Sequence, residues 1–219
     1  MWSMKPEVVI FDLDGTLVDS RLDLAAAVNL VLSDLGFEAL PPERIVTFIG
    51  HGVERLLERA LGGSALVDEA RMLFDHHYGR ALLDQTRPYA GIDELVRDLG
   101  ATRALAVATN KPGRWARAIV AGLGWDEAIP HVVGGADVAR LKPAPDMVEL
   151  TLEDSGCPRA RAVVVGDMEV DVELARATGL PCVGVSWGLA GRERLQAAGA
   201  RWIVDSASEL RALLDDCPL

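Results

Sequence analysis

The sequence lacks a long hydrophobic run and an excess of positive charge. The apolar stretch at residues 8–11 is too short for a membrane span or a secretion signal, and no later segment is long enough. Lysine and arginine total 22 against 33 aspartate and glutamate residues, a formal net charge of −11, and the basic residues form no run. Nucleic acids and anionic membrane surfaces are therefore poor candidate partners. We expect a globular, soluble protein.

Cysteine is also scarce. Cys157, Cys182 and Cys217 are odd in number, widely spaced and not in a C-x-x-C arrangement. This pattern argues against a disulfide framework or a zinc site and favours a reducing cytoplasm. We expect these cysteines to be small buried hydrophobic residues or, near the C-terminal tail, an unpaired thiol.

Short β-branched runs alternate with helical patterns over most of the 219 residues. This alternation predicts an α/β fold with a doubly wound parallel, Rossmann-like sheet between two layers of helices. The predicted strands are residues 8–12, 105–109, 132–134, 162–166, 182–185 and 202–204.

One stretch breaks this alternation. Between Ser20 and Thr86 the sequence has helical periodicity and no convincing strand, which predicts a small all-helical domain inserted after the first strand. We therefore divide the chain into an α/β core of residues 1–17 and 88–219 and a helical domain of residues 18–87. The apolar positions with this periodicity are Leu24, Val28, Leu32 and Leu35, then Leu56, Leu57, Ala60 and Leu61, then Met72, Leu73, Ala81 and Leu82.

Two carboxylates, Asp12 and Asp14, follow the first predicted strand. Ligands bind at the carboxyl ends of parallel strands, so this pair lies where a site is expected. A carboxylate is a competent nucleophile toward phosphorus when a metal screens its charge, and a second one can protonate the leaving oxygen and then activate water. Alone, the pair fits a simple turn equally well.

Further polar residues follow other predicted strands. Thr109 and Asn110 offer a hydroxyl and amide donors to a phosphoryl oxygen, and Lys142 lies on a loop that two prolines stiffen. Asp167 and Asp171 are four residues apart at the start of a predicted helix, which places both carboxylates on one side, as a hard cation requires. Each residue also has an ordinary alternative, as a turn former, a solvated lysine or a complement to the helix dipole.

Together these residues resemble, in order and spacing, the four motifs of the haloacid dehalogenase-like hydrolase superfamily. The motifs read Asp-Leu-Asp-Gly-Thr-Leu-Val-Asp-Ser at 12–20, Thr-Asn-Lys at 109–111, Leu-Lys-Pro-Ala-Pro-Asp at 141–146 and Gly-Asp-Met-Glu-Val-Asp at 166–171. The resemblance implies a magnesium-dependent phosphomonoester hydrolase, with the helical insert as its small cap domain.

The same resemblance implies a role for each matching residue. Asp12 would be the nucleophile that forms an aspartyl-phosphate, and Asp14 the general acid and base. Lys142 would steady the nucleophile and the phosphoryl group, and Thr109 would bind phosphate. The implied magnesium ligands are Asp12, the backbone carbonyl of Asp14 and Asp167, with Asp171 supporting the metal-bound waters.

Residues 49–61 and the tail from Val183 resemble bacterial phosphoglycolate phosphatases. Gly52 would present free N–H groups to an anionic group at the start of a helix, and Arg59, by resemblance, would approach the carboxylate end of a substrate such as 2-phosphoglycolate. His51 stands where asparagine is more usual, and Met168 where a small polar residue is usual. The arginines of this helix also fit a solvated face laced with ion pairs.

Several alternatives stay open at this point. A sugar-phosphate phosphatase or a hexose-phosphate mutase would use the same scaffold, and a non-catalytic phosphate-binding regulatory protein could retain the fold. The expected partner is a small phosphorylated metabolite, and the chain could be a monomer or a homodimer.

Overall fold

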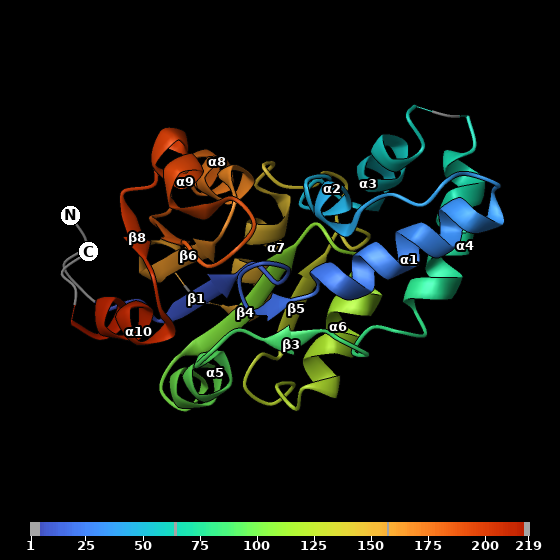
Figure 1. Cartoon of the computed structure of the whole chain (residues 1–219). Helices are drawn as coiled ribbons and strands as arrows, with labels where there is room; N and C mark the ends of the chain where they lie inside the picture. Colours follow the sequence, from blue (N-terminus) through green and yellow to red (C-terminus); the bar gives the residue numbers. More distant parts are fainter. Residues whose placement is uncertain (1–4, 64, 157, 217–219) are drawn as a thin grey trace.

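The computed structural model describes residues 5–63, 65–156 and 158–216. Six parallel strands form one sheet in the order β5-β4-β1-β6-β7-β8 (Figure 1). The strands are β1 (Val8–Phe11), β4 (Ala104–Thr109), β5 (His131–Gly134), β6 (Ala162–Gly166), β7 (Cys182–Val185) and β8 (Trp202–Val204). Each lies within one residue of its predicted range, so the predicted α/β fold with a doubly wound parallel sheet is confirmed.

Helices cover both faces of this sheet. In β1, Val9 and Phe11 belong to the hydrophobic cluster on one face, whereas Val8 and Ile10 belong to the other, because successive side chains of a strand alternate. The first cluster includes α5 (Ile92–Gly100), α6 (Gly113–Gly122) and α10 (Ala207–Asp216). The second includes α7 (Asp146–Ser155), α8 (Glu169–Thr178) and α9 (Gly191–Ala198). A 3-10 turn at Arg159–Arg161 precedes β6.

The order of the strands determines where a site can form. The chain places β4 and β5 on one side of β1 and then crosses to build β6, β7 and β8 on the other. The carboxyl ends of β4, β1 and β6 therefore meet at the point where the strand order reverses, which is the usual ligand position in open α/β sheets. Thr109, Asp12 and Asp167 lie at these three ends.

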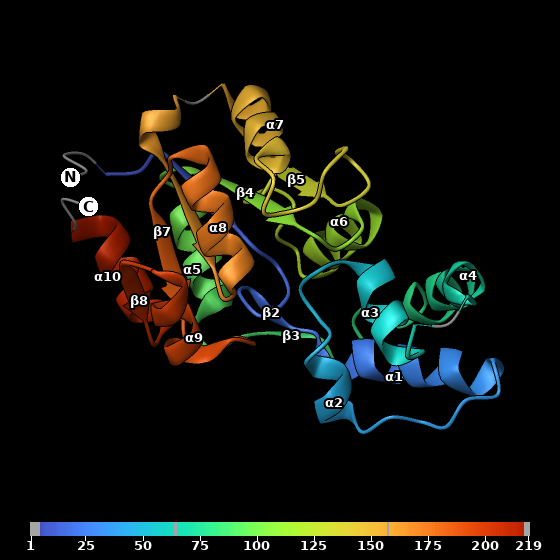
Figure 2. The ribbon, with the colours of Figure 1, turned by 90° about the horizontal axis from the view of Figure 1, so that it is seen from above.

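Four helices lie between residues 20 and 86 of the chain. They are α1 (Arg21–Asp34), α2 (Pro42–Val46), α3 (Val53–Ala60) and α4 (Val67–Tyr78). They share a hydrophobic cluster of their own and lie together beside the sheet rather than over one of its faces (Figures 1 and 2). The chain enters and leaves this group through two short antiparallel strands, β2 (Val18–Asp19) and β3 (Arg87–Pro88). Strands of two residues have no detectable period, so the sequence did not predict them.

Helix α4 differs in detail from the predicted apolar pattern. Met72 is 69% exposed, whereas Phe74 and Tyr78 are fully buried. Phe74 stacks on Tyr78 at 5.3 Å between ring centroids, and both rings meet Trp115 of α6 edge-on. The helix turns its aromatic residues inward because their large rings bury more apolar surface than a methionine does.

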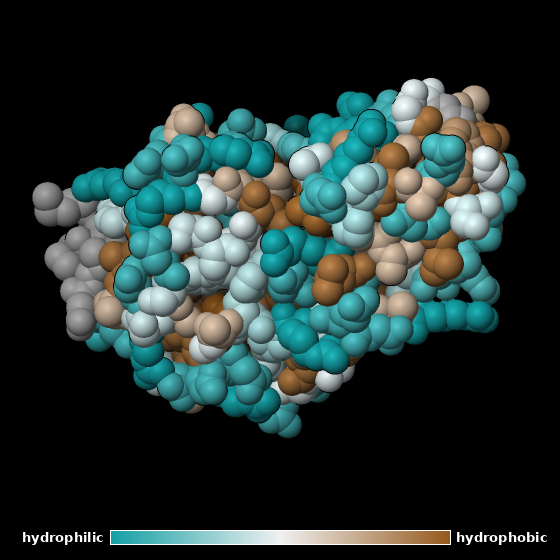
Figure 3. Space-filling view, viewed as in Figure 1, coloured by the Kyte–Doolittle hydropathy of each residue, from teal (hydrophilic) through white to brown (hydrophobic). Residues whose placement is uncertain are grey.

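The surface and the cysteines fit the expectations from composition. The face seen in Figure 3 is mostly hydrophilic, with hydrophobic residues in small separate groups. Among the described residues, no helix has the length and apolar character needed to cross a membrane. Cys182 is a buried free thiol, as expected, whereas Cys157 and Cys217 lie outside the described residues.

Candidate active site

Asp12 follows the central strand and is the residue on which the site is built. Its Oδ1 accepts a hydrogen bond from the Leu13 N–H at 2.7 Å and pairs with Lys142 Nζ at 2.9 Å. Within the described chain no group donates to Oδ2. Burial raises the pKa of Asp12 to about 6, an effect that Lys142 opposes and the nearby Asp171 carboxylate reinforces.

Three buried carboxylates gather at this edge. One oxygen each of Asp12, Asp167 and Asp171 lies within 4.8 Å of the others. Lys142 Nζ is the ammonium between Asp12 and Asp171, at 2.9 and 2.7 Å. Three carboxylates facing one ammonium leave two negative charges uncompensated in a buried place, which is costly. Hard oxygen ligands with this charge excess fit a divalent cation such as magnesium.

Asp167 and Asp171 are each held by hydrogen bonds in addition. Asp167 accepts the Thr16 hydroxyl at 3.0 Å and the Leu189 N–H at 2.7 Å. Asp171, in the first turn of α8, accepts the Met168 N–H at 3.1 Å. Burial, followed by the charges of Asp12 and Asp171, raises the pKa of Asp167 well above its ordinary value. The two carboxylates are therefore fixed in direction before any ligand binds.

Glycines let the loops approach these acids. A Cβ on Gly15 would lie 2.2 Å from Asp167 Oδ2, and a Cβ on Gly166 would lie 2.2 Å from Asp171 Cγ. Gly188, in the loop after β7, would meet Asp167 Cβ at 2.3 Å. Gly188 had no signal in the sequence that linked it to the site, because its role depends on a contact with a different loop.

Asp14 lies apart from the acid cluster. Both of its oxygens contact Lys111 Nζ at 2.9 Å, and Oδ1 also accepts the Ser20 hydroxyl. Sequence reasoning did not assign a role to Lys111, although it is the third residue of the Thr-Asn-Lys motif. The ligand role expected for the Asp14 carbonyl stays a prediction.

The side chain of Asn110 joins two loops. Its Nδ2 donates to the carbonyl of Gly50 at 3.0 Å and to that of Lys142 at 3.3 Å, and its Oδ1 accepts the Lys142 N–H at 2.8 Å. The amide is thus engaged with backbone groups, and its expected role as a donor to a phosphoryl oxygen stays a prediction. Thr109 is buried at the end of β4 and accepts the Lys111 N–H at 3.3 Å.

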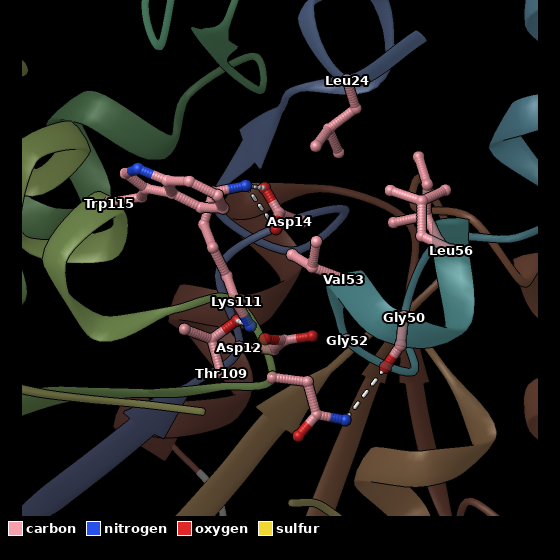
Figure 4. A pocket seen from close by; sticks show the side chains of 12 residues that line it. Asp12, Asp14, Leu24, Gly50, Gly52, Val53, Leu56, Thr109, Lys111 and Trp115 are labelled. Atoms are coloured by element: carbon pink, nitrogen blue, oxygen red, sulfur yellow. Dashed lines mark hydrogen bonds and ion pairs between the residues drawn. The ribbon is translucent and has the colours of Figure 1, made fainter. Parts of the chain in front are cut away.

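A pocket lies between the sheet edge and the helical group (Figure 4). The space within it is about 450 Å³ when open solvent is included. Figure 4 shows Asp12 and Thr109 in one part of the pocket, with Lys111 reaching to Asp14. The lining residues are Asp12, Asp14, Leu24, Ile49, Gly50, Gly52, Val53, Leu56, Thr109, Asn110, Lys111 and Trp115.

The structure separates the two predicted substrate residues of the helical group. Gly52 lines the pocket directly before α3, with a φ of +86°. Arg59 is exposed and is not among the lining residues, so its expected contact with substrate stays a prediction. Its neighbour Arg55 forms an exposed ion pair with Glu58 at 2.9 Å, as expected for a solvated face.

Comparison with known sequences agrees with this geometry. The family model for haloacid dehalogenase-like hydrolases matches residues 9–185. A phosphoglycolate phosphatase from Colwellia psychrerythraea is 35% identical over 214 residues, covering 93% of this chain and 95% of that protein. A plasmid-encoded phosphoglycolate phosphatase from Cupriavidus necator is 37% identical over 221 residues, covering 97% and 94%.

Solved structures are similar over the same length. A predicted phosphoglycolate phosphatase from Haemophilus somnus superposes with a TM-score of 0.89 at 27% identity, covering 96% of this chain and 98% of that one. A predicted phosphatase from Clostridium acetobutylicum superposes with a TM-score of 0.88 at 25% identity, covering 98% and 100%. The motifs, the fold and these relatives show that the chain belongs to the haloacid dehalogenase-like hydrolases, as a phosphatase similar to the phosphoglycolate phosphatases.

Proposed function

We propose that this phosphatase is magnesium-dependent, forms an aspartyl-phosphate on Asp12, and acts on 2-phosphoglycolate or a similar small phosphorylated metabolite. The observation that carries the proposal is the buried Asp12 carboxylate, which lines the pocket and whose Oδ1 is held by Lys142 while no described group donates to Oδ2. The relatives named phosphoglycolate phosphatase support this substrate.

Two displacements at phosphorus account for the reaction. Asp12 Oδ2 forms a bond to phosphorus as the bond to the leaving oxygen breaks, and Asp14 gives that oxygen a proton. Asp14 then takes a proton from water as the water oxygen bonds to phosphorus and the bond between phosphorus and Asp12 Oδ2 breaks, which releases phosphate and restores the Asp12 carboxylate. Lys142 keeps the nucleophile in place during both displacements.

The acid cluster would hold the magnesium ion. Asp12, Asp167 and the carbonyl of Asp14 are the expected ligands, with Asp171 supporting the metal-bound waters. When bound, the ion neutralises the excess negative charge of the carboxylates and of the substrate phosphoryl group. The Thr16 and Leu189 donors that orient Asp167 support this assignment, because they leave the acid fixed toward the cluster.

We further propose that residues 18–87 act as a cap over the pocket. Leu24 of α1 and Val53 and Leu56 of α3 give the pocket an apolar wall on the helical side (Figure 4). Closure of this wall would exclude water while the phosphoryl group is transferred. The paired strands β2 and β3 are the two connections through which such a movement would pass.

The direct test is phosphate release by wild type and Asp12→Asn. The substitution is nearly isosteric, so we expect an intact fold by circular dichroism and activity below about a thousandth of wild type. Beryllium fluoride should be trapped on Asp12 of the wild type only.

Exhaustive chelation should abolish the activity, magnesium should restore it and calcium should inhibit it. Full activity without a divalent cation would refute the metal requirement.

The substrate is tested by a panel of phosphomonoesters ranked by kcat/KM. We expect 2-phosphoglycolate to exceed hexose phosphates and nucleoside monophosphates. A higher value for hexose phosphates would favour the sugar-phosphate phosphatase. Transfer of the phosphoryl group to a sugar phosphate rather than to water would instead identify a mutase.

A further inference from the structure

One cationic side chain, Lys111, lines the pocket, whereas the motifs and the resemblance led us to expect Lys142 and Arg59. Of the lining residues within the described chain, only Lys111 carries a positive charge, and the two acidic ones are Asp12 and Asp14. Arg59 and Lys142 are not among the residues that line the pocket, and Lys142 forms ion pairs with Asp12 and Asp171. An anionic group on a substrate other than its phosphoryl group therefore has a single protein ammonium to meet there.

Lys111 is held in position from both halves of the molecule. Its Nζ contacts both oxygens of Asp14 at 2.9 Å, and it lies 4.6 Å from the ring centroid of Tyr78 in α4. The Lys111 side chain is only 3% exposed, so its conformational freedom is already lost before a ligand binds. A preorganised ammonium binds an anion without a further ordering cost.

Asp14 supplies only part of what this ammonium can bind. An ammonium has three N–H donors, and Asp14 accepts two of them. Asp14 is the only carboxylate of the described residues that pairs with Lys111. The third donor has no carboxylate partner, and its described neighbour is Tyr78, whose ring centroid lies 4.6 Å from Nζ. A substrate carboxylate would reach this donor from the pocket that Lys111 lines.

The size of the proposed substrate places its carboxylate near this donor. Asp14 must reach the leaving oxygen to protonate it, and in 2-phosphoglycolate one CH2 group separates this oxygen from the carboxylate carbon. The substrate carboxylate would then lie beside the Asp14 carboxylate. Asp14 carries a proton when it acts as the acid, so the Lys111 ammonium that contacts it then lacks a charged partner, and the substrate carboxylate would supply one.

We propose that Lys111 determines specificity for phosphomonoesters that carry a carboxylate next to the leaving oxygen, by binding this carboxylate together with Asp14. The inference rests on the proposed function and replaces Arg59 with Lys111 as the residue that recognises the end of the substrate opposite the phosphoryl group. Asp14 and Tyr78 act as the groups that position its ammonium.

The experiment compares 2-phosphoglycolate with ethyl phosphate, which has the same two-carbon chain and a methyl group in place of the carboxylate. The measured quantity is the ratio of their kcat/KM values in wild type, Lys111→Met, Lys111→Arg and Arg59→Ala. Any misfolded fraction cancels in this ratio, because both substrates are assayed on the same preparation. We expect Lys111→Met to lower the ratio by about tenfold or more, as for a lost hydrogen bond to a charged group. Lys111→Arg should retain part of the ratio, and Arg59→Ala should leave it unchanged.

Three outcomes would overturn the inference. An equal loss for both substrates in Lys111→Met would mean that Lys111 only positions Asp14. A lower ratio in Arg59→Ala with an unchanged ratio in Lys111→Met would return the role to Arg59. A failure of the proposed function is distinct, because wild type itself would then fail to prefer 2-phosphoglycolate. Calorimetric binding of 2-phosphoglycolate to Asp12→Asn and to Asp12→Asn with Lys111→Met checks the contact without turnover, and equal affinities would also count against it.

Discussion

Two carboxylates that are two residues apart have different lysine partners. Asp12 pairs with Lys142, and Asp14 pairs with Lys111, each at 2.9 Å. A buried ammonium is tolerated only beside an opposite charge, and Lys111 meets this need with Asp14 whereas Lys142 meets it with Asp12 and Asp171. This division keeps the proposed nucleophile apart from the proposed acid and base.

A glycine controls how closely the first loop approaches Asp167. Gly15 has a φ of +91°, and a Cβ there would lie 2.2 Å from Asp167 Oδ2. Gly15→Ala should therefore displace the carboxylate and lower kcat/KM by about a hundredfold or more. Steady-state kinetics with magnesium measures this loss.

Gly36→Ala is the matched control, because Gly36 also has a positive φ of +77° but no atom within 4 Å of the added Cβ. It should cost about 1 kcal/mol of stability from backbone strain and leave kcat/KM intact. Similar kinetic losses in both variants would mean that backbone strain, rather than the contact with Asp167, explains the result.

Two contacts at Gly50 attach the loop before α3 to the α/β core: a hydrogen bond from Asn110 and packing on Met168. The Gly50 carbonyl accepts from Asn110, and a Cβ on Gly50 would lie 2.3 Å from Met168 Sδ. Met168, unusual at its position, thus packs directly under this loop. The same Asn110 side chain holds the backbone of Lys142, so the helical group and the lysine loop share one anchor.

Removing this anchor should loosen both loops at once. In Asn110→Ala we expect faster amide hydrogen exchange at residues 49–53 and around Lys142, because these segments lose their shared hydrogen bonds. Mass spectrometry of peptides from the exchanged protein measures the change.

Asn29→Ala provides the comparison, since Asn29 makes two hydrogen bonds to the Leu40 backbone within the helical group. Its effect should be confined to the segment around Leu40. Unchanged exchange at 49–53 in Asn110→Ala would show that packing on Met168 alone holds the loop.

The whole molecule is acidic, and its most concentrated buried charge lies at the site. The net charge of −11 is spread over the chain, but three carboxylates with one lysine lie together behind the pocket. Folding brings these charges together against their mutual repulsion. The metal-free fold is therefore less stable than its hydrophobic clusters alone would make it.

The burial of Asp12 predicts a pH dependence of stability with a definite sign. Burial raises the pKa of Asp12 from 3.8 to about 6, so between these values the folded protein keeps a proton that the unfolded chain has lost. The contribution to stability is present below the lower value and is lost as the pH rises through about 6. In the presence of a chelator, the Tm of wild type should fall relative to that of Asp12→Asn over this range.

At pH values above this range, magnesium should raise the Tm of the wild type, because the ion binds the folded state only. Differential scanning calorimetry at a series of pH values measures both effects. A constant difference in Tm between the two proteins across the range would contradict the burial of Asp12 as the cause.

Much of this protein was predictable from local sequence. Strands such as Ala162–Gly166 are short, apolar and buried on both faces, and their sequence pattern is sufficient to locate them. Acids that directly follow such strands, as Asp12 and Asp167 do, lie at the carboxyl edge in any parallel sheet. The fold class and the acid cluster are in this sense properties of the sequence.

Other features depended on tertiary structure, because they join residues that are distant in the chain. Lys111 and Asp14 are 97 positions apart, and Asn110 and Gly50 are 60 apart. The stability of such a contact depends on the burial and the direction of each side chain, and the sequence near each residue does not reveal either property. The sequence by itself determined which chemical groups are present at the sheet edge. The tertiary structure decided that Arg59 stays outside the pocket. It also decided that Asp14 pairs with Lys111, because a buried charge requires a partner that only the assembled fold supplies.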